Sequence, residues 1–308
     1  MRASIIEFRL RMLIMIAIVF VGFWSPWFGL WDFGRRIPTL EWIPLELSRL
    51  GLTSFAVATP IVIVFGALIA LAGAVLRVWG TAYLGYSTVH HGDMQAGAVM
   101  ADGPYRYMRN PLYVGGWFMM LAISLLMPPS GALFSMVLLT IFFLRLILGE
   151  EAFLGKQLGQ PYAEYLRSVP RLIPRLRSSL PPAGNKPRWL TALLTEIMPI
   201  GMFVTMAVLA WFYDQQLMLE GLFWSFLASL FARGMMKAWI PTLASAAVYI
   251  TAFAYFHLNW RRSILIAFGV WLIVRALVPP KESKVGESKL DELNAGESQT
   301  REPKADSA

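Results

Sequence analysis

The sequence contains no cysteine and only three histidines in 308 residues. The absence of cysteine excludes disulfide frameworks, thiolate metal sites, iron–sulfur clusters and cysteine nucleophiles. Three scattered histidines are too few for a His-rich zinc or di-iron centre, so we expect no metal site. Charged residues are also scarce, at 15% of the chain, whereas a soluble domain usually has about 25%. This low charge disfavours a water-soluble globule.

Bulky apolar side chains are present in excess. Hydrophobic residues make up 57% of the chain, with 12 Trp, 20 Phe and 16 Met, and the mean hydropathy is +0.56. The net charge of +8 favours an anionic membrane face, and not nucleic acid, as the partner. No two glycines are spaced as GxG, which excludes a dinucleotide fingerprint. The composition predicts an integral membrane protein that contacts membrane lipids.

Long charge-free runs predict an all-α, polytopic bundle of about eight transmembrane helices. The predicted spans are residues 12–31, 50–76, 112–127, 132–148, 190–213, 217–232, 238–257 and 262–278. The segment Pro128-Pro129-Ser130-Gly131 interrupts an uncharged run and predicts a tight helical hairpin. Basic residues between 155 and 190 place that segment and the N-terminus in the cytoplasm. We expect the membrane to be a bacterial inner (plasma) membrane. The oligomeric state cannot be predicted.

The hairpin brings opposite charges to one membrane edge. Arg109 lies 20 residues before Pro129, and Glu150 lies 20 residues after Ser130. Because both helical arms rise equally per residue, an antiparallel hairpin places Arg109 beside Glu150 and Glu151. The sequence therefore predicts a cation that faces two carboxylates at the cytoplasmic edge.

Such an edge offers three kinds of contact. An arginine is a planar donor for a carboxylate or phosphate, and carboxylates suit an ammonium group or sugar hydroxyls. The nearby rings of Tyr105, Tyr107 and Tyr113 suit a ring or a cation. S-adenosylmethionine, a zwitterion with a ring and a positive sulfur, would match all three. The alternative is an Arg–Glu pair that only anchors two helices.

Several short motifs follow one another around the hairpin. They are Leu76-Arg77-Val78-Trp79-Gly80, Gly103-Pro104-Tyr105, Arg109-Asn110-Pro111-Leu112-Tyr113, Glu150-Glu151 and a stretch from Gly159 to Pro174. Their order and separation resemble the isoprenylcysteine carboxyl methyltransferase and phospholipid methyltransferase superfamily. The resemblance covers residues 60–176. It implies an integral membrane enzyme that uses S-adenosylmethionine, with the hairpin forming the cofactor site.

The resemblance also implies roles for individual residues. The expected cofactor-binding residues are Tyr105, Arg109, Asn110, Pro111, Tyr113, Glu150 and Glu151. Arg109 and Glu150 are the expected catalytic residues, and Arg109 would hold the carboxylate of the cofactor. Asn110 stands where the family most often has histidine. Asparagine can donate and accept hydrogen bonds like a neutral imidazole, but it cannot become cationic.

The chain then divides into three parts. Residues 1–188 would form a membrane methyltransferase-like core with its motifs at 76–176, residues 189–278 would add C-terminal transmembrane helices, and residues 279–308 would form a disordered charged tail. The expected activity is methyl transfer to a lipid, prenylated or thiol acceptor at the cytoplasmic membrane face. Two alternatives stay open: an NADPH-dependent membrane reductase of the steroid-reductase type, and a non-enzymatic membrane protein or transporter.

Overall fold

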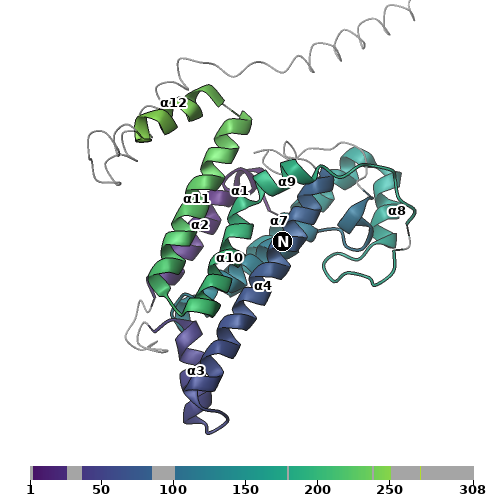
Figure 1. Ribbon diagram of the computed structural model, residues 1–308. Helices are drawn as coiled ribbons and strands as arrows, with labels where there is room; N and C mark the ends of the chain where they lie inside the picture. Colours follow the sequence, from purple (N-terminus) through teal and green to yellow (C-terminus); the bar gives the residue numbers. More distant parts are fainter. Residues whose placement is uncertain are drawn as a thin grey trace, which may run out of the picture. The chain divides into compact units, whose positions relative to one another are not determined.

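The computed structural model describes residues 3–25, 37–84, 101–178, 180–237, 239–250 and 271. These residues fall into two compact units, 1–232 and 233–308. Every regular element in the described ranges is a helix (Figure 1). The all-α prediction is therefore confirmed for this part of the chain.

The first unit holds nearly all of these helices. They are α1 (Ile5–Arg9), α2 (Arg11–Phe23), α3 (Thr39–Arg49), α4 (Phe55–Leu84), the short 3-10 helix η2 (Gly103–Arg106), α6 (Pro111–Ser124), α7 (Pro129–Leu158), α8 (Gln160–Ser168), α9 (Trp189–Thr195), α10 (Ile197–Phe212) and most of α11 (Gln215–Lys237). The second unit contains α12 (Trp239–Ile250).

Three helices are long and apolar enough to cross a membrane, namely α4, α7 and α11. Helices α9 and α10 add a fourth span if they are counted together, although they are bent by 68° at their junction. Helices α2 and α6 are apolar but shorter, with 13 and 14 residues. The described residues thus support three or four spans and do not confirm eight. The predicted span 262–278, apart from Trp271, and the predicted tail 279–308 lie outside them.

The predicted hairpin is present, because α6 ends at Ser124 and α7 begins at Pro129. Two predicted helix ends were wrong. Helix α7 continues beyond 148 to Leu158, where Gly159 follows with a φ of 59°, a conformation that suits glycine at a helix end. Helix α4 continues beyond 76 to Leu84. The charge of Arg77 does not end α4, because a carboxylate inside the unit pairs with it.

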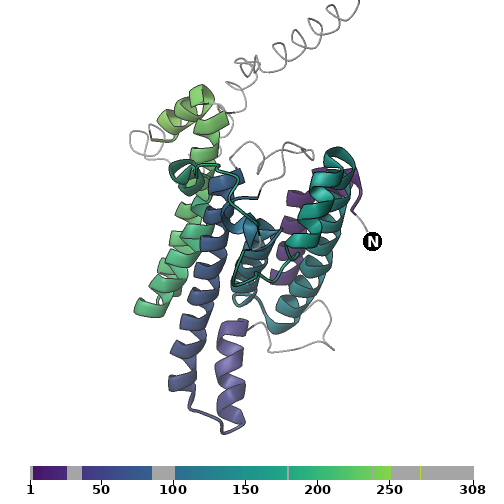
Figure 2. The ribbon, with the colours of Figure 1, turned by 90° about the vertical axis from the view of Figure 1, so that its right-hand side faces the viewer.

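Helix α4 is the long central helix of the first unit, and its Phe55 end lies beside α3 (Figures 1 and 2). It packs against both α6 and α10, with Val62, Ala70, Met119 and Met206 in the shared core. The contact between α4 and α6 is close enough to require glycine. A Cβ atom on Gly73 would lie 2.9 Å from the Gly115 carbonyl oxygen. Small residues at such a contact allow two membrane helices to pack backbone to backbone.

Helix α7, the second arm of the hairpin, packs against α6 and also against α2. In the C-terminal half of α7, Arg145 donates two hydrogen bonds to Glu7 of α1, at 2.8 and 2.9 Å. This pairing lowers the pKa of Glu7 to about 2, helped by the Ser4 backbone N–H. The N-terminal helices are thus fixed to the arm that carries Glu150 and Glu151.

Candidate active site

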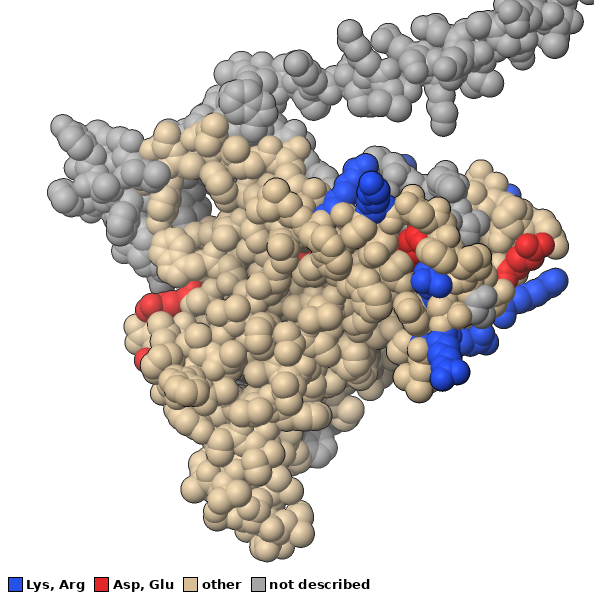
Figure 3. Space-filling model, turned by 45° about the vertical axis from the view of Figure 1, so that its right-hand side comes forward, with Lys and Arg blue, Asp and Glu red and all other residues tan. Residues whose placement is uncertain are grey.

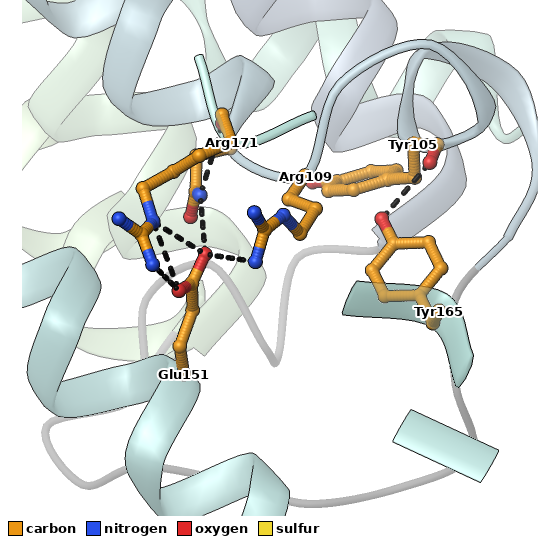
Figure 4. A network of polar contacts seen from close by, with 6 residues as sticks. Tyr105, Arg109, Glu151, Tyr165 and Arg171 are labelled. Carbon is orange, nitrogen blue, oxygen red and sulfur yellow. Dashed lines mark hydrogen bonds and ion pairs between the residues drawn. The ribbon is translucent and has the colours of Figure 1, made fainter. Parts of the chain in front are cut away.

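The predicted meeting of Arg109 with the acidic pair is found where α6 begins and α7 nears its end. Arg109 Nη1 lies 3.1 Å from Glu151 Oε1 (Figure 4). The Glu151 side chain is only 8% exposed, so the pair is buried. Truncating one partner of such a pair is costly, because the other charge is left without compensation.

A second arginine completes this cluster. Arg171 follows α8 and donates from Nε and Nη2 to Glu151 Oε2 at 3.0 and 2.8 Å (Figure 4). The hydrogen bond to Glu151 raises the pKa of Arg171. From the sequence, Arg171 was expected only as part of a motif stretch and as one of the basic residues between 155 and 190, and not as a site residue. The sequence feature that could have indicated a role is the cation directly after Val169 and Pro170 in the motif stretch. The sequence alone, however, does not show that this loop residue lies beside α7.

Asn110 joins the same cluster from the N-terminus of α6. Its Nδ2 donates to Glu151 Oε1 at 3.3 Å and to the Arg171 carbonyl oxygen at 3.2 Å. Glu151 therefore accepts from two arginines and an amide, which occupies both of its oxygens. Pro111 is the first residue of α6, a position where a missing N–H costs nothing. In this structure Pro111 starts the helix that Asn110 precedes.

Glu150 lies in a different environment from its neighbour. It accepts a hydrogen bond from the Tyr113 hydroxyl at 3.0 Å, and Arg11 of α2 acts electrostatically on both side chains. The ring of Tyr113 packs edge to face on Phe143, with centroids 5.9 Å apart. The two adjacent carboxylates thus have different partners: Glu151 pairs with Arg109 and Arg171, and Glu150 with Tyr113.

Buried tyrosines form one wall of the site. Tyr162 and Tyr165 of α8 have ring centroids 5.8 Å apart, and the Tyr165 hydroxyl donates to the Tyr105 carbonyl oxygen at 2.9 Å (Figure 4). Burial raises the pKa of both α8 tyrosines, so they stay protonated. Tyr107, which we expected to flank the site, instead packs its ring against Trp79 of α4, with centroids 6.0 Å apart.

Two buried polar atoms at the site have no hydrogen-bond partner among the residues that the structure describes. They are the Tyr105 hydroxyl and Arg109 Nε. Tyr105 is 7% exposed, and a Cβ on Gly80 of α4 would lie 3.5 Å from its hydroxyl. An unsatisfied buried polar group costs about 1–3 kcal/mol. A polar ligand group would remove that cost, so these atoms mark where a ligand would be stabilised.

The segment after α8 holds the loop that carries Arg109. We call this segment, residues 170–178 and 180–188, the strap. The Arg109 amide donates to the Pro170 carbonyl at 2.9 Å, and the Arg175 amide donates to the Tyr107 carbonyl at 3.1 Å. Arg106 donates from Nε and Nη2 to the Leu180 carbonyl at 3.0 and 2.6 Å. The strap thereby fixes the backbone on which Arg109 stands.

Asp102 fastens the far part of the strap. Its carboxylate accepts from the Ala183 and Asn185 amides and from Asn185 Nδ2, each at 2.8 Å. Burial alone would raise the pKa of Asp102, but the hydrogen bonds from Asn185, Ala183 and Gly184 outweigh it and lower the pKa. Asp102 is therefore ionised at neutral pH and acts as a structural acceptor.

A further buried ion pair lies within the first unit. Arg77 of α4 donates from Nε and Nη2 to the two Glu196 oxygens at 2.6 and 3.0 Å, and Thr81 Oγ1 donates to Glu196 at 2.6 Å. Glu196 is completely buried and lies at the bend between α9 and α10. Sequence reasoning treated 190–213 as one uninterrupted apolar run. The missed signal was an acidic residue within it, since charges inside membrane segments require partners.

Comparisons with known proteins agree with the resemblance. Residues 61–161 match the family model described as phospholipid methyltransferase. The chain is 40% identical over 78 residues to a protein-S-isoprenylcysteine O-methyltransferase from Schizosaccharomyces pombe, which covers 25% of this chain and 33% of that protein. It is 41% identical over 70 residues to a methanethiol S-methyltransferase from Crocosphaera subtropica, which covers 23% of this chain and 27% of that protein.

The chain therefore spans a third or less of the length of these curated relatives. No solved structure matches it. The matched residues include Arg109, Asn110, Tyr113, Glu150 and Glu151 within the family segment. The resemblance of this segment to the membrane methyltransferase superfamily is thus confirmed, whereas Arg171 and Glu196 lie beyond residue 161.

Proposed function

We propose that this protein is an integral membrane methyltransferase that binds S-adenosylmethionine at the Arg109–Glu151–Arg171 cluster. The observation that carries this proposal is the buried Glu151 carboxylate, paired with Arg109 and Arg171, beside two buried polar atoms that have no partner among the described residues, the Tyr105 hydroxyl and Arg109 Nε. Tyr105, Arg109 and Glu151 lie inside the segment that matches the family. A site that only anchors two helices would have no need for such atoms.

The chemistry of the residues present fits this cofactor. Arg109 would bind the cofactor's carboxylate through its guanidinium, while Glu151 holds that side chain in place. Glu150 and Tyr113 would accept from an ammonium group or ribose hydroxyls, and the tyrosine wall would lie against the ring or the sulfonium. When bound, the cofactor supplies an activated methyl group. Asn110 and Pro111 would contribute by fixing the start of α6.

The chain's own contribution to catalysis would be alignment and exclusion of water. Glu151 positions both arginines, and the strap covers the loop that carries Arg109. An acceptor that is already ionised, such as a prenylcysteine carboxylate, needs no base. A thiol or amine acceptor would need its proton removed, and Glu150 is the carboxylate with a single direct hydrogen-bond partner among the described residues.

The acceptor that we propose is lipophilic: a lipid, a prenylated group or a small thiol. Methanethiol and isoprenylcysteine are the acceptors in the names of the two relatives, and both can partition into a membrane. We place the site and the N-terminus at the cytoplasmic face of a bacterial inner membrane. Support for this orientation comes from the basic residues of the strap.

The first test is a calorimetric titration of the detergent-purified protein with S-adenosylhomocysteine, with NADPH as a comparator. Saturable binding of S-adenosylhomocysteine is expected, and both Arg109→Ala and Glu150→Gln should weaken it. Arg49→Ala is the matched control, because Arg49 is an exposed α3 residue that pairs with Glu46 of the same helix. Binding of NADPH alone would assign the protein to the reductases. Binding that survives both site variants would place the pocket elsewhere.

A further inference from the structure

We propose that the loop at residues 171–177 docks on anionic phospholipid headgroups and that this contact stabilises the candidate cofactor site. The loop is part of the strap, between α8 and α9. The docking follows from the loop's own side chains. Its effect on cofactor binding rests on the function proposed above, and the experiments below separate the two.

The loop exposes two large apolar side chains outside any helix. Leu176 is 100% exposed and Ile173 is 82% exposed. Exposed apolar side chains on the spanning helices face lipid and need no explanation. These two instead stand on an irregular segment beside the polar site, where full exposure to water would be unfavourable. A membrane interface would bury them without requiring the loop to cross the bilayer.

Exposed basic residues are frequent in this loop and in the chain on either side of it. Arg167, Arg175, Arg177, Lys186 and Arg188 are all exposed, and no acidic residue occurs between 165 and 195. In Figure 3, blue Lys and Arg side chains lie at the upper middle and at the right of this face, with a few red acidic side chains among those at the right, beside a broad tan surface with few charges. A loop that exposes both arginines and apolar side chains matches an anionic headgroup layer over acyl chains.

The same loop reaches the candidate site through its first residue. Arg171 pairs with Glu151, only two positions before Ile173, and the Arg175 amide is bonded to the Tyr107 carbonyl. Insertion of Ile173 and Leu176 into the interface would therefore restrict the segment that holds Arg171 on Glu151. Because Glu151 also holds Arg109, the contact with lipid would stabilise the side chain that we expect to bind the cofactor's carboxylate.

The charge of the loop indicates which lipids it contacts. A zwitterionic leaflet could bury Ile173 and Leu176 but would not attract the arginines, whereas an anionic leaflet would bury the apolar side chains and also attract the arginines. Each Lys or Arg near such a surface strengthens membrane contact by about fivefold. Substitution of Arg175 and Arg177 by glutamine should therefore weaken docking by about 25-fold on anionic bilayers and have little effect on neutral ones.

The absence of native cysteine allows a direct test. The variant Leu176→Cys is labelled with an environment-sensitive fluorophore and placed in nanodiscs, one copy per disc, made of phosphatidylcholine with or without phosphatidylglycerol. Lipids that carry a spin-label quencher report depth. Gln160→Cys, at an exposed position on α8, is the matched control. We expect blue-shifted, quenched emission at 176, stronger with phosphatidylglycerol and weakened by Arg175→Gln with Arg177→Gln.

Emission at 176 that equals the control and ignores lipid composition would overturn the docking. A shift that requires two copies per disc would also overturn it, in favour of contact between copies of the chain. Quenching that does not depend on phosphatidylglycerol would overturn the anionic headgroup as the partner.

The link to the cofactor site needs a second measurement on the unlabelled protein. S-adenosylhomocysteine should bind more tightly in discs with phosphatidylglycerol, and Ile173→Ser with Leu176→Ser should remove that difference. Docking at 176 with an unchanged affinity would overturn the link and leave the docking intact. Docking without any binding of S-adenosylhomocysteine would overturn the proposed function and the link, but not the lipid contact.

Discussion

Replacing Glu196 with glutamine should destabilise the protein more than any surface substitution. The change keeps the shape of the side chain but removes its charge. Arg77 would then have a guanidinium inside the helical unit with no counter-charge on the atoms 2.6 and 3.0 Å from it. The amide nitrogen of the glutamine is a donor, and it would face the Arg77 and Thr81 donors that now bind the two Glu196 oxygens.

The magnitude follows from the burial of the two partners. Breaking a buried ion pair by removing one partner typically costs about 3–5 kcal/mol. Glu196 is 0% exposed, but the Arg77 side chain retains 22% exposure and can recover some solvation. We therefore expect a loss at the lower end, about 3 kcal/mol. For a unit of this size, that loss corresponds to a fall in Tm of about 6–12 °C.

The assay is thermal unfolding in detergent, followed by intrinsic tryptophan fluorescence. Glu46→Gln is the matched control, because it makes the same substitution in an exposed pair with Arg49; exposed pairs contribute about 1 kcal/mol or less. The double variant Arg77→Met with Glu196→Leu should recover most of the lost stability, because apolar residues of similar volume often replace a buried pair without loss. A loss of stability in Glu196→Gln no larger than in Glu46→Gln, or a double variant as unstable as the single one, would refute a stabilising role for the buried pair.

Three further predictions concern other parts of the first unit. Arg145 and the Ser4 backbone N–H lower the pKa of Glu7 from 4.5 to about 2. The contact of α1 with α7 should therefore be fully stabilised above about pH 4.5 and lost as the pH falls toward 2. Hydrogen exchange of the α1 amides should show this pH dependence, and Glu7→Gln should abolish it. Gly115→Ala should cost about 1–3 kcal/mol in unfolding measurements, because its Cβ would lie 3.0 Å from a backbone oxygen of α4, whereas Gly155→Ala, which meets one atom at 3.9 Å, should cost nothing. Glu151→Gln should lower both the Tm and the affinity for S-adenosylhomocysteine, whereas Glu150→Gln should lower the affinity with a smaller change in Tm; equal Tm losses would contradict the division of roles.

The hairpin and the meeting of Arg109 with Glu151 could be predicted because both depend on regular geometry. Two helices that start from one turn rise equally, so counting residues from Pro129 is enough. Arg171 could not be placed in this way, because it stands on an irregular strap whose path depends on hydrogen bonds to the loop before α6. The motif predicted that Arg109 would lie near the acidic pair, but not that Glu151 and Glu150 contact different partners.

The end of α4 and the bend at Glu196 could not be predicted for a related reason. A single charge at the edge of an apolar run usually marks where the helix meets water, and the predicted span therefore ended at residue 76, directly before Arg77. Its partner lies more than one hundred residues away in the sequence, and only the packing of α10 on α4 brings them together. Long-range pairing of this kind leaves no periodic signal in the chain.

The polar contacts around the hairpin determine how much of the chain would have to be transferred to another protein together with the hairpin. The segment that matches the family ends at residue 161, but Glu151 draws one of its arginines from position 171, and Arg77 draws its counter-charge from position 196. Grafting the matched segment alone onto another scaffold would deliver a buried arginine without its acid and a carboxylate with half its cations. The smallest transplantable piece therefore runs from α1 through α10, because helices beyond the matched segment supply charges that its own residues pair with.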